Sequence, residues 1–276
     1  MNVEPFEFRG TGGARLHAVC WSPATGSHSA VVLAHGLAEH GGRYGALVER
    51  LVARGHRVYA PDHRGHGRSE GARAYVERFD WLVEDLDRVF VRARAAHAAP
   101  ATLIGHSMGG AVAFAYALRH PANVARLVLS APLLATDPSP PRVRLAAARL
   151  LSRVAPRVGA LKLPADTVSR DPAVVRAYEG DPLVYRGAIS ARTLVELVDA
   201  TSRFAAGAAG LRTRVLILHG TGDALVPLRH CAPVYERIDP RLRTLRTYDG
   251  LYHELFNEPE RAAIYAEVEA WLAANP

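Results

Sequence analysis

The stretch ATLIGHSMGGAVAFAYAL (residues 101–118) changes its pattern at its middle. Its apolar first part is typical of a buried strand, and the part after Gly110 has the apolar spacing of a helix. Ser107 therefore lies on a strand-to-helix turn, inside the pattern Gly-His-Ser-Met-Gly. This G-x-S-x-G pattern predicts a sharp turn that exposes the serine hydroxyl as a nucleophile, and its glycines avoid clashes with the neighbouring strand and helix. A serine that caps the helix is the structural alternative.

Short apolar runs alternate with helical stretches on both sides of this turn. The opening residues 4–23 indicate two short strands joined by the turn GTGG. Further apolar runs end in Gly, Pro or Asp clusters; they are SAVVLAHG (29–36), GHRVYAPDHRGHG (55–67), RLVLSAP (126–132), RVLILHGTGD (214–223) and LRTLRTYDG (242–250). The alternation predicts an α/β fold with a mostly parallel eight-stranded sheet and helices on both faces.

The alternation is interrupted between residues 135 and 205. This part is rich in Arg, Ala and Pro, and no convincing strand is expected in it. We predict a helical cap inserted after the sixth strand, with residues 1–134 and 206–276 forming the core.

The composition is that of a globular protein, because 49% of the 276 residues are hydrophobic and 22% are charged. The net charge of +7 comes almost entirely from arginine. No basic run is interleaved with aromatic residues, so nucleic acid is not an expected partner. Cys20 and Cys231 are expected to be buried free thiols. Neither a signal peptide nor an apolar transmembrane run is recognisable, so a cytoplasmic location is expected, with peripheral membrane association as an addition.

A serine nucleophile needs a base and a group that orients the base. After a strand-turn-helix serine these partners follow in the order acid, then histidine. Asp223 follows a buried strand and His253 follows the last strand, so both are expected at the same sheet edge as Ser107. The competing acids are Asp249, which is close to the base in sequence, and Asp199, which lies in the insertion.

The tetrahedral intermediate of a serine nucleophile carries a negative oxygen, which needs preorganised N–H donors. The backbone N–H groups of Met108 and Leu37 are the expected donors, because they follow the nucleophile and the third strand. His106 is expected to point away across the turn. Turn or surface positions are expected for three other histidines, His63, His66 and His120. No metal ligand set has a suitable spacing, so no metal and no cofactor are expected.

Five blocks together resemble the monoacylglycerol lipase group of α/β-hydrolases, also described as lysophospholipase-like. They are HGLAEHGGRY (35–44), DHRGHGRSEG (62–71), GHSMGG (105–110), HGTGDALVP (219–227) and YHELFNEPE (252–260). SAP (130–132) and SRDPAVVRAYEGDPLV (169–184) resemble bacterial members of the group. The resemblance implies an α/β-hydrolase fold with a lid of helices over the active site, and it implies hydrolysis of a single acyl chain on glycerol.

The resemblance also implies that Glu39 and Arg43 help to bind the glycerol hydroxyls. A local salt bridge between them that caps the next helix is the alternative, and both can hold at once. Glu254 is a further candidate for the polar end of the site. Asp62 and Arg64 are expected to tie the loop after the fourth strand to the core.

The insertion begins with a basic amphipathic pattern. One predicted helical face carries Val143, Leu150, Val154, Val158 and Leu161, and an adjoining face carries Arg142, Arg149, Arg153 and Arg157. Pro156 is expected to kink or split this helix. Such a helix can lie on an anionic membrane surface, or it can bury its apolar face on the core.

The predicted function is therefore cleavage of monoacylglycerol, or of a similar single-chain lipid ester, through an acyl-enzyme. A lysophospholipase or broad carboxylesterase would use the same catalytic groups. A binding protein without catalysis is a remote alternative, because all three members of the Ser-Asp-His set are present.

Overall fold

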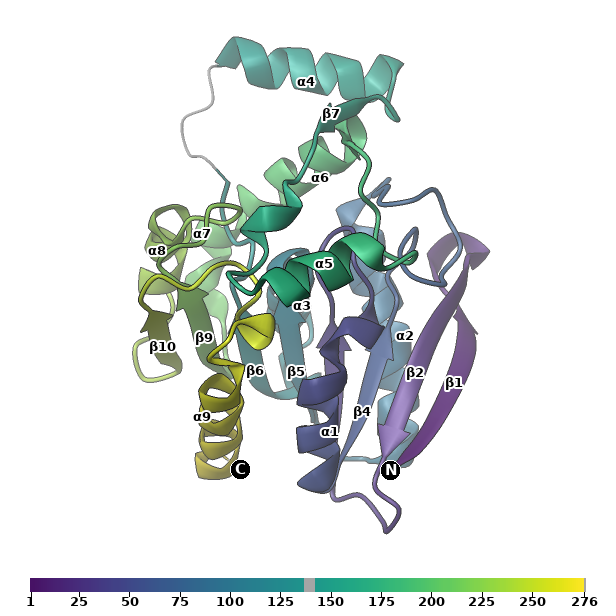
Figure 1. Ribbon diagram of the computed structural model, residues 1–276, viewed down its shortest axis with the longest axis vertical. Coiled ribbons are helices and arrows are strands. Elements are labelled where there is room, and N and C mark those ends of the chain that lie inside the picture. Colours follow the sequence, from purple (N-terminus) through teal and green to yellow (C-terminus); the bar gives the residue numbers. More distant parts are fainter. Residues whose placement is uncertain (137–141, 276) are drawn as a thin grey trace.

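An eight-stranded sheet forms the centre of the computed structural model, which describes residues 1–136 and 142–275 (Figure 1). Its strands in spatial order are β1 (Asn2–Arg9), β2 (Arg15–Ser22), β4 (His56–Pro61), β3 (Ser29–Ala34), β5 (Ala101–His106), β6 (Val124–Ser130), β9 (Arg214–Gly220) and β10 (Arg243–Tyr248). The pairs β1–β2 and β2–β4 are antiparallel, and all pairs from β4 to β10 are parallel. The predicted mostly parallel sheet is confirmed.

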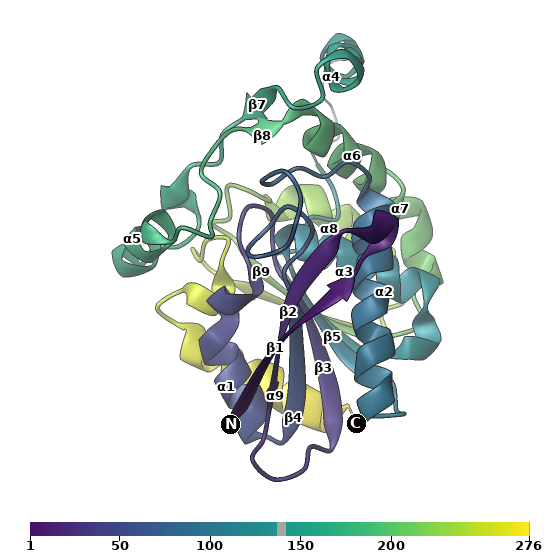
Figure 2. The same ribbon diagram turned by 90° about the vertical axis from the view of Figure 1, so that its right-hand side faces the viewer.

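Helices cover both faces of the sheet (Figure 2). One face packs against α1 (Gly45–Ala53) and α9 (Arg261–Ala274), and the other packs against α2 (Phe79–Ala96), α3 (Ser107–Arg119) and α8 (Leu228–Glu236). Successive side chains of a strand point to opposite faces, so Val31 and Leu33 join the first layer and Val32 and Ala34 the second. Burial on both faces explains why the strands are nearly continuous apolar runs.

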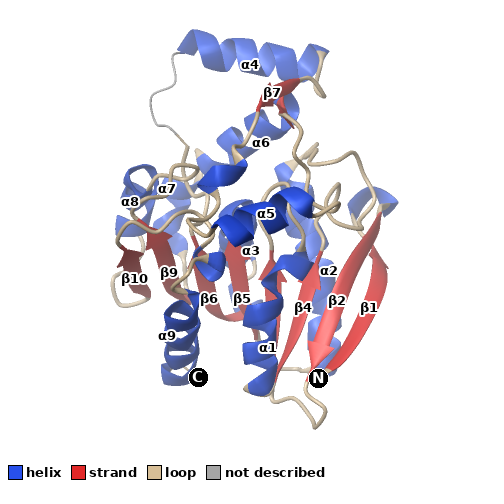
Figure 3. Cartoon of the chain, in the orientation of Figure 1, coloured by secondary structure: helices blue, strands red, loops and turns tan. Residues whose placement is uncertain are grey.

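The chain between β6 and β9 forms a layer over the carboxyl edge of the parallel strands (Figure 3). Its elements are α4 (Arg142–Val154), β7 (Gly159–Leu161), α5 (Pro172–Gly180), β8 (Ile189–Ser190), α6 (Ala191–Thr201) and α7 (Phe204–Gly207). The expectation of no strand here was wrong, because β7 and β8 pair antiparallel. These strands have only three and two residues, which is too short for an alternating pattern. The helix α4 ends before Pro156, as expected for a residue that cannot continue a helix.

Single 3₁₀ turns complete the connections. They are η1 (Thr11–Gly13), η2 (Gly41–Tyr44), η3 (Pro121–Asn123), η4 (Ala165–Thr167), η5 (Ala208–Gly210) and η6 (Leu255–Asn257).

The loop after β4 is tied to the core through two acidic side chains. Asp62 accepts hydrogen bonds from the backbone N–H groups of Gly41 at 3.0 Å and Arg68 at 2.9 Å. Arg64 donates two bonds, of 2.7 and 2.8 Å, to the carboxylate of Asp85. These contacts confirm the structural role predicted for Asp62 and Arg64.

His63 and His66 lie on the loop of turns after β4, which is one of the two positions expected for them, and not at the surface. Both are buried, and their rings pack 4.4 and 5.4 Å from the ring of His35. The loop folds inward, so its histidines fill space beneath the turn after β3. Cys20 and Cys231 are free and buried, which confirms the prediction for the thiols.

The apolar side chains after the start of α4 face outward. Leu150, Val154, Val158 and Leu161 are 62%, 71%, 47% and 46% exposed, so they do not pack on the core. The side chains of Arg142 and Val143 lie outside the described residues. In the part of the chain that the structure describes, no helix is both long and apolar enough to cross a membrane.

Candidate active site

Ser107 is the first residue of α3 and lies on the sharp turn after β5. Its φ of 52° is in the left-handed region, where a non-glycine residue is strained by about 1–3 kcal/mol. A Cβ on Gly105 would lie 2.6 Å from the carbonyl oxygen of Gly109, and a Cβ on Gly109 would lie 2.1 Å from that of Ala34. The two glycines therefore permit the tight packing of strand, turn and helix that presents the serine hydroxyl.

The structure brings Ser107, His253 and Asp223 together in one chain of hydrogen bonds. His253 Nε2 lies 2.8 Å from Ser107 Oγ, and His253 Nδ1 lies 2.7 Å from Asp223 Oδ2. Because a carboxylate can only accept, Nδ1 carries the proton and Nε2 is free to accept from the serine hydroxyl. The other oxygen of Asp223 accepts from the N–H groups of Leu225 and Val226, at 2.9 and 2.8 Å, which fixes the carboxylate.

The acid and base influence each other's protonation. Burial acts to lower the pKa of His253, but the adjacent Asp223 carboxylate outweighs it and holds the pKa above its ordinary value. Burial acts to raise the pKa of Asp223, but the His253 contact and the backbone hydrogen bonds keep that pKa below its ordinary value. The pair therefore favours a charged acid beside a histidine of increased basicity.

The two competing acids lie elsewhere. Asp249 accepts a hydrogen bond from Thr221 Oγ1 at 3.0 Å. Asp199 pairs with Arg149 at 2.7 Å on the surface of the insertion. Asp223 is therefore the acid that contacts the histidine.

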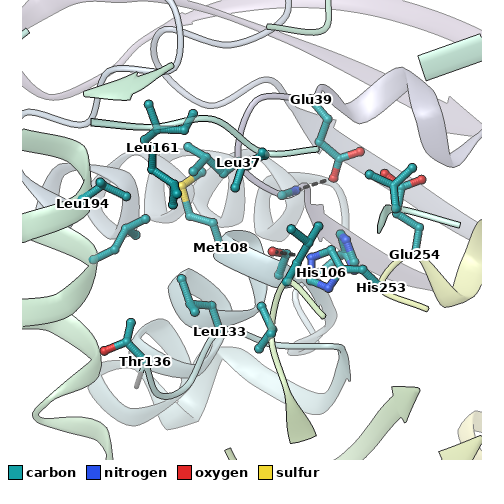
Figure 4. A pocket seen from close by; sticks show the side chains of 18 of the residues that line it. Leu37, Glu39, His106, Met108, Leu133, Thr136, Leu161, Leu194, His253 and Glu254 are labelled. Carbon is teal, nitrogen blue, oxygen red and sulfur yellow. Dashed lines mark hydrogen bonds between the residues drawn. The ribbon is translucent and has the colours of Figure 1, made fainter. Parts of the chain in front are cut away.

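His106 does not point away from the site, and that expectation was wrong. Its ring lies 4.7 Å from the ring of His253 and lines the same pocket (Figure 4). Burial lowers the pKa of His106 to about 3, so the ring is neutral near pH 7. It supports the side of the His253 ring by packing.

The turn after β3 lies directly against the serine. A Cβ on Gly36 would lie 3.2 Å from the Cβ of Ser107, and Leu37 and Met108 line the pocket with that serine. Ala38 has a left-handed φ of 68°, and its carbonyl accepts from the N–H of Tyr185 in the insertion at 2.8 Å. The turn therefore contacts both Ser107 and the insertion.

The polar end of the pocket is a buried ionic network. Arg43 donates to Glu39 Oε2 at 2.8 Å and forms two bonds, of 2.5 and 2.7 Å, with the carboxylate of Glu254. Tyr178 from α5 stacks on the guanidinium at 4.8 Å. The salt bridge between Glu39 and Arg43 is thus present. It does not cap the following 3₁₀ turn, because His40 supplies that cap.

The two carboxylates of this network share one cation. Burial raises the pKa of Glu39, and the negative charge of Glu254 adds to this effect against the opposing Arg43. Burial also acts to raise the pKa of Glu254, but its two bonds from Arg43 hold it below the ordinary value. The network therefore places two buried carboxylates around one guanidinium at the wall of the pocket.

The rest of the pocket is apolar, and the insertion supplies most of it. Figure 4 shows Leu161 and Leu194 on the side opposite Glu39 and Glu254. The apolar lining residues contributed by the insertion are Leu161, Leu163, Val168, Ile189, Leu194, Leu197 and Val198. Ser107 lines the same pocket as the polar end and this apolar wall.

Sequence reasoning did not assign roles to Tyr44, Tyr178 or His35. Tyr44 and His35 stand at the two ends of the block 35–44, so their place in that block was the available signal. Tyr178 lies in the insertion, and only the fold brings it to Arg43. Within the described ranges, no group of three or more His, Cys, Asp or Glu side chains could hold a metal ion.

The fold and the site define a serine hydrolase of the α/β-hydrolase class. A family model described as "Serine aminopeptidase, S33" matches residues 25–260. A monoacylglycerol lipase of Mycolicibacterium smegmatis is 39% identical over 97% of this chain and 96% of its own length. The human monoglyceride lipase is 32% identical over 95% of this chain and 88% of its own length.

A solved structure agrees with these relatives. The crystal structure of Paleococcus ferrophilus monoacylglycerol lipase matches with a TM-score of 0.85 at 31% identity, covering 95% of this chain and 99% of that one. The chain belongs to this S33 family and, within it, to the monoacylglycerol lipases.

Proposed function

We propose that the protein hydrolyses monoacylglycerols to a fatty acid and glycerol. The observation that carries this proposal is that Ser107 lines one pocket together with a polar end and an apolar wall. A monoacylglycerol has the same division, because its ester joins a glycerol with two hydroxyls to one acyl chain. Glu39, Arg43 and Glu254 form the end that receives the glycerol.

The reaction uses an acyl-enzyme intermediate. Ser107 Oγ attacks the ester carbonyl while His253 accepts its proton, and His253 then protonates the departing glycerol oxygen. Water, activated by His253, adds to the acyl-enzyme and releases the fatty acid. Asp223 holds the imidazole in the required tautomer and stabilises its cation.

The negative oxygen of each tetrahedral intermediate is bound by the N–H groups of Leu37 and Met108. The N–H of Met108 is in the first turn of α3, where backbone N–H groups lack partners within the helix and the helix dipole favours negative charge. Each such donor contributes about 10²–10³ to turnover.

The charge of the polar end favours a neutral head group. Glycerol hydroxyls can donate to carboxylates, whereas a phosphate would face Glu39 and Glu254. Arg43 cannot offset this, because it is already paired with both carboxylates. A lysophospholipid is therefore the poorer substrate.

Fatty acid release from three lipids tests this proposal. We expect monooleoylglycerol to be cleaved at least ~10-fold faster, in kcat/KM, than the anionic lysophosphatidylglycerol, since facing like charges cost several kcal/mol and ~1.4 kcal/mol corresponds to tenfold. Dioleoylglycerol tests whether a second acyl chain is accepted, and it is expected to be a poor substrate. Equal or faster cleavage of lysophosphatidylglycerol would contradict the role given to the polar end and favour a lysophospholipase.

Residues 135–205 act in this proposal as the cap, or lid, on a core of residues 1–134 and 206–276. The side chains of Leu150, Val154 and Val158 are exposed on the cap. Leu161, which follows them in the sequence, is also exposed and lines the pocket. Exposed Arg153 and Arg157 accompany them. The cap thereby offers a basic and apolar surface to an anionic membrane, with the pocket at its edge.

Replacing Val154 by aspartate is expected to weaken binding to anionic vesicles by about tenfold, because it removes an apolar contact and adds repulsion near the lipid surface. Val91→Asp is the matched control, since Val91 is 60% exposed on α2, which is not part of the cap. Co-sedimentation with phosphatidylglycerol vesicles at low and high salt measures the effect. Equal loss in both variants, or salt-independent binding, would argue against an electrostatic contact through the cap.

A further inference from the structure

The turn after β3 is held by side chains on both sides of Gly36. The N–H of Gly36 donates to Glu39 Oε1 at 2.5 Å, and its carbonyl oxygen lies 2.7 Å from His35 Nδ1. His35 Nε2 accepts from the N–H of His63 at 2.9 Å, so the proton of the neutral ring is on Nδ1, which donates to the Gly36 carbonyl. Burial keeps the pKa of His35 well below its ordinary value, which maintains this neutral form.

These contacts act on the peptide that carries one of the proposed oxyanion donors. The carbonyl of Gly36 and the N–H of Leu37 belong to the same planar peptide, so fixing the oxygen also fixes the direction of the N–H. The bond from Gly36 N–H to Glu39 fixes the preceding peptide. Gly36 has unusual backbone freedom, and the two hydrogen bonds remove it at the point where alignment matters.

Glu39 is itself held by donors from the protein. Oε1 also accepts from the hydroxyl of Tyr44 at 2.6 Å, and Oε2 accepts from Arg43 at 2.8 Å. Three donors therefore engage the carboxylate, and only 3% of the residue is exposed. Such a group is better placed to hold a backbone than to reorganise around each substrate.

We infer that Glu39, supported by Tyr44, is a positioning residue that aligns the Leu37 N–H for the oxyanion. This inference rests on the proposed function, which assigns Leu37 as a donor. It goes beyond contact with the glycerol, because it makes Glu39 necessary for every ester, including esters whose alcohol part has no hydroxyl to bind.

The test compares the cleavage of two esters by the protein and its variants. Monooleoylglycerol has hydroxyls on its leaving group, and p-nitrophenyl butyrate has none. For Glu39→Ala we expect kcat to fall by about 10²–10³ on both esters, with KM within a few-fold of wild type. Tyr44→Phe is expected to lower kcat by about tenfold on both. Glu39→Gln is expected to recover most of the loss, because its amide oxygen can still accept from Gly36.

A transition-state analogue adds a second measurement. A trifluoromethyl ketone forms a tetrahedral adduct with the serine, and its oxyanion needs the same N–H groups. Its inhibition constant is expected to rise across the variants by the factor by which kcat/KM falls. If Glu39→Ala does not fold, as judged by thermal melting, Tyr44→Phe and Glu39→Gln carry the comparison.

The inference is overturned if Glu39→Ala affects only monooleoylglycerol, by raising KM, while cleavage of p-nitrophenyl butyrate and inhibition by the ketone stay within about threefold. Glu39 would then be a ligand of the alcohol alone. Failure of the proposed function would give a different result, because the wild-type protein would then cleave p-nitrophenyl butyrate but not monooleoylglycerol. In that case the effect of Glu39→Ala on p-nitrophenyl butyrate still decides the positioning role.

Discussion

Replacing Ser107 by alanine is expected to lower kcat on monooleoylglycerol by about 10⁶-fold, because the variant has no oxygen that can form the acyl-enzyme. The loss should leave the fold intact, since alanine can occupy the same strained turn at a similar cost. Fatty acid release under substrate excess measures kcat. Labelling with a fluorophosphonate, which reacts with activated serines, is expected for wild type and not for the variant.

Ser130→Ala is the matched control for this experiment. Ser130 is also a buried serine at the carboxyl end of a parallel strand, and its hydroxyl lies 3.4 Å from His106. Its replacement is expected to leave kcat within a few-fold of wild type. Residual activity of Ser107→Ala close to that of wild type would show that another group is the nucleophile.

Replacing Asp223 by asparagine is expected to lower kcat by about 10⁴-fold, because the amide no longer holds His253 in the tautomer that accepts from the serine. The change also affects the pH profile. Activity requires neutral His253 and so decreases as the pH drops through the pKa of this histidine. Without the Asp223 charge, burial dominates and the pKa decreases, so the acid limb of kcat/KM is expected at lower pH than in wild type.

Asp249→Asn and Asp199→Asn are the controls for the choice of acid. Both remove a carboxylate that the structure places away from His253, and kcat is expected to stay within a few-fold of wild type. A loss of ~10⁴ in either control, with Asp223→Asn active, would reverse the assignment. An unchanged acid limb in Asp223→Asn would contradict the pKa argument.

The sheet was predictable because both of its faces are covered. Strands such as β5 and β9 are then nearly continuous apolar runs, and this pattern is recognisable without knowledge of the partners. The meeting of Ser107, Asp223 and His253 at one edge of the sheet was predictable for a related reason. Parallel strands bring their carboxyl ends to one edge, so each following loop could be placed before its side chains were known.

Other features depend on contacts between segments that are distant in sequence. His106 was expected to point away, but packing against His253 at 4.7 Å determines its orientation. The exposed side chains of Leu150 and Val154 have the spacing of a buried helical face, and periodicity does not distinguish burial on a core from exposure. Tyr44 binds Glu39 from five residues away, but nothing in its local pattern indicates an acceptor.

The hydrogen bond from the N–H of Tyr185 to the carbonyl of Ala38 limits which segments of this enzyme can be exchanged for those of a relative. Chimaeras that exchange the proposed cap for the corresponding segment of another lipase are a natural way to engineer chain-length preference. An exchange that omits the backbone donor at position 185 leaves the left-handed Ala38 without this support. Ala38 is two residues from Gly36, which packs against Ser107. A graft that keeps residues 181–185 from the recipient is therefore expected to change selectivity, whereas one that replaces them would also slow turnover on every substrate.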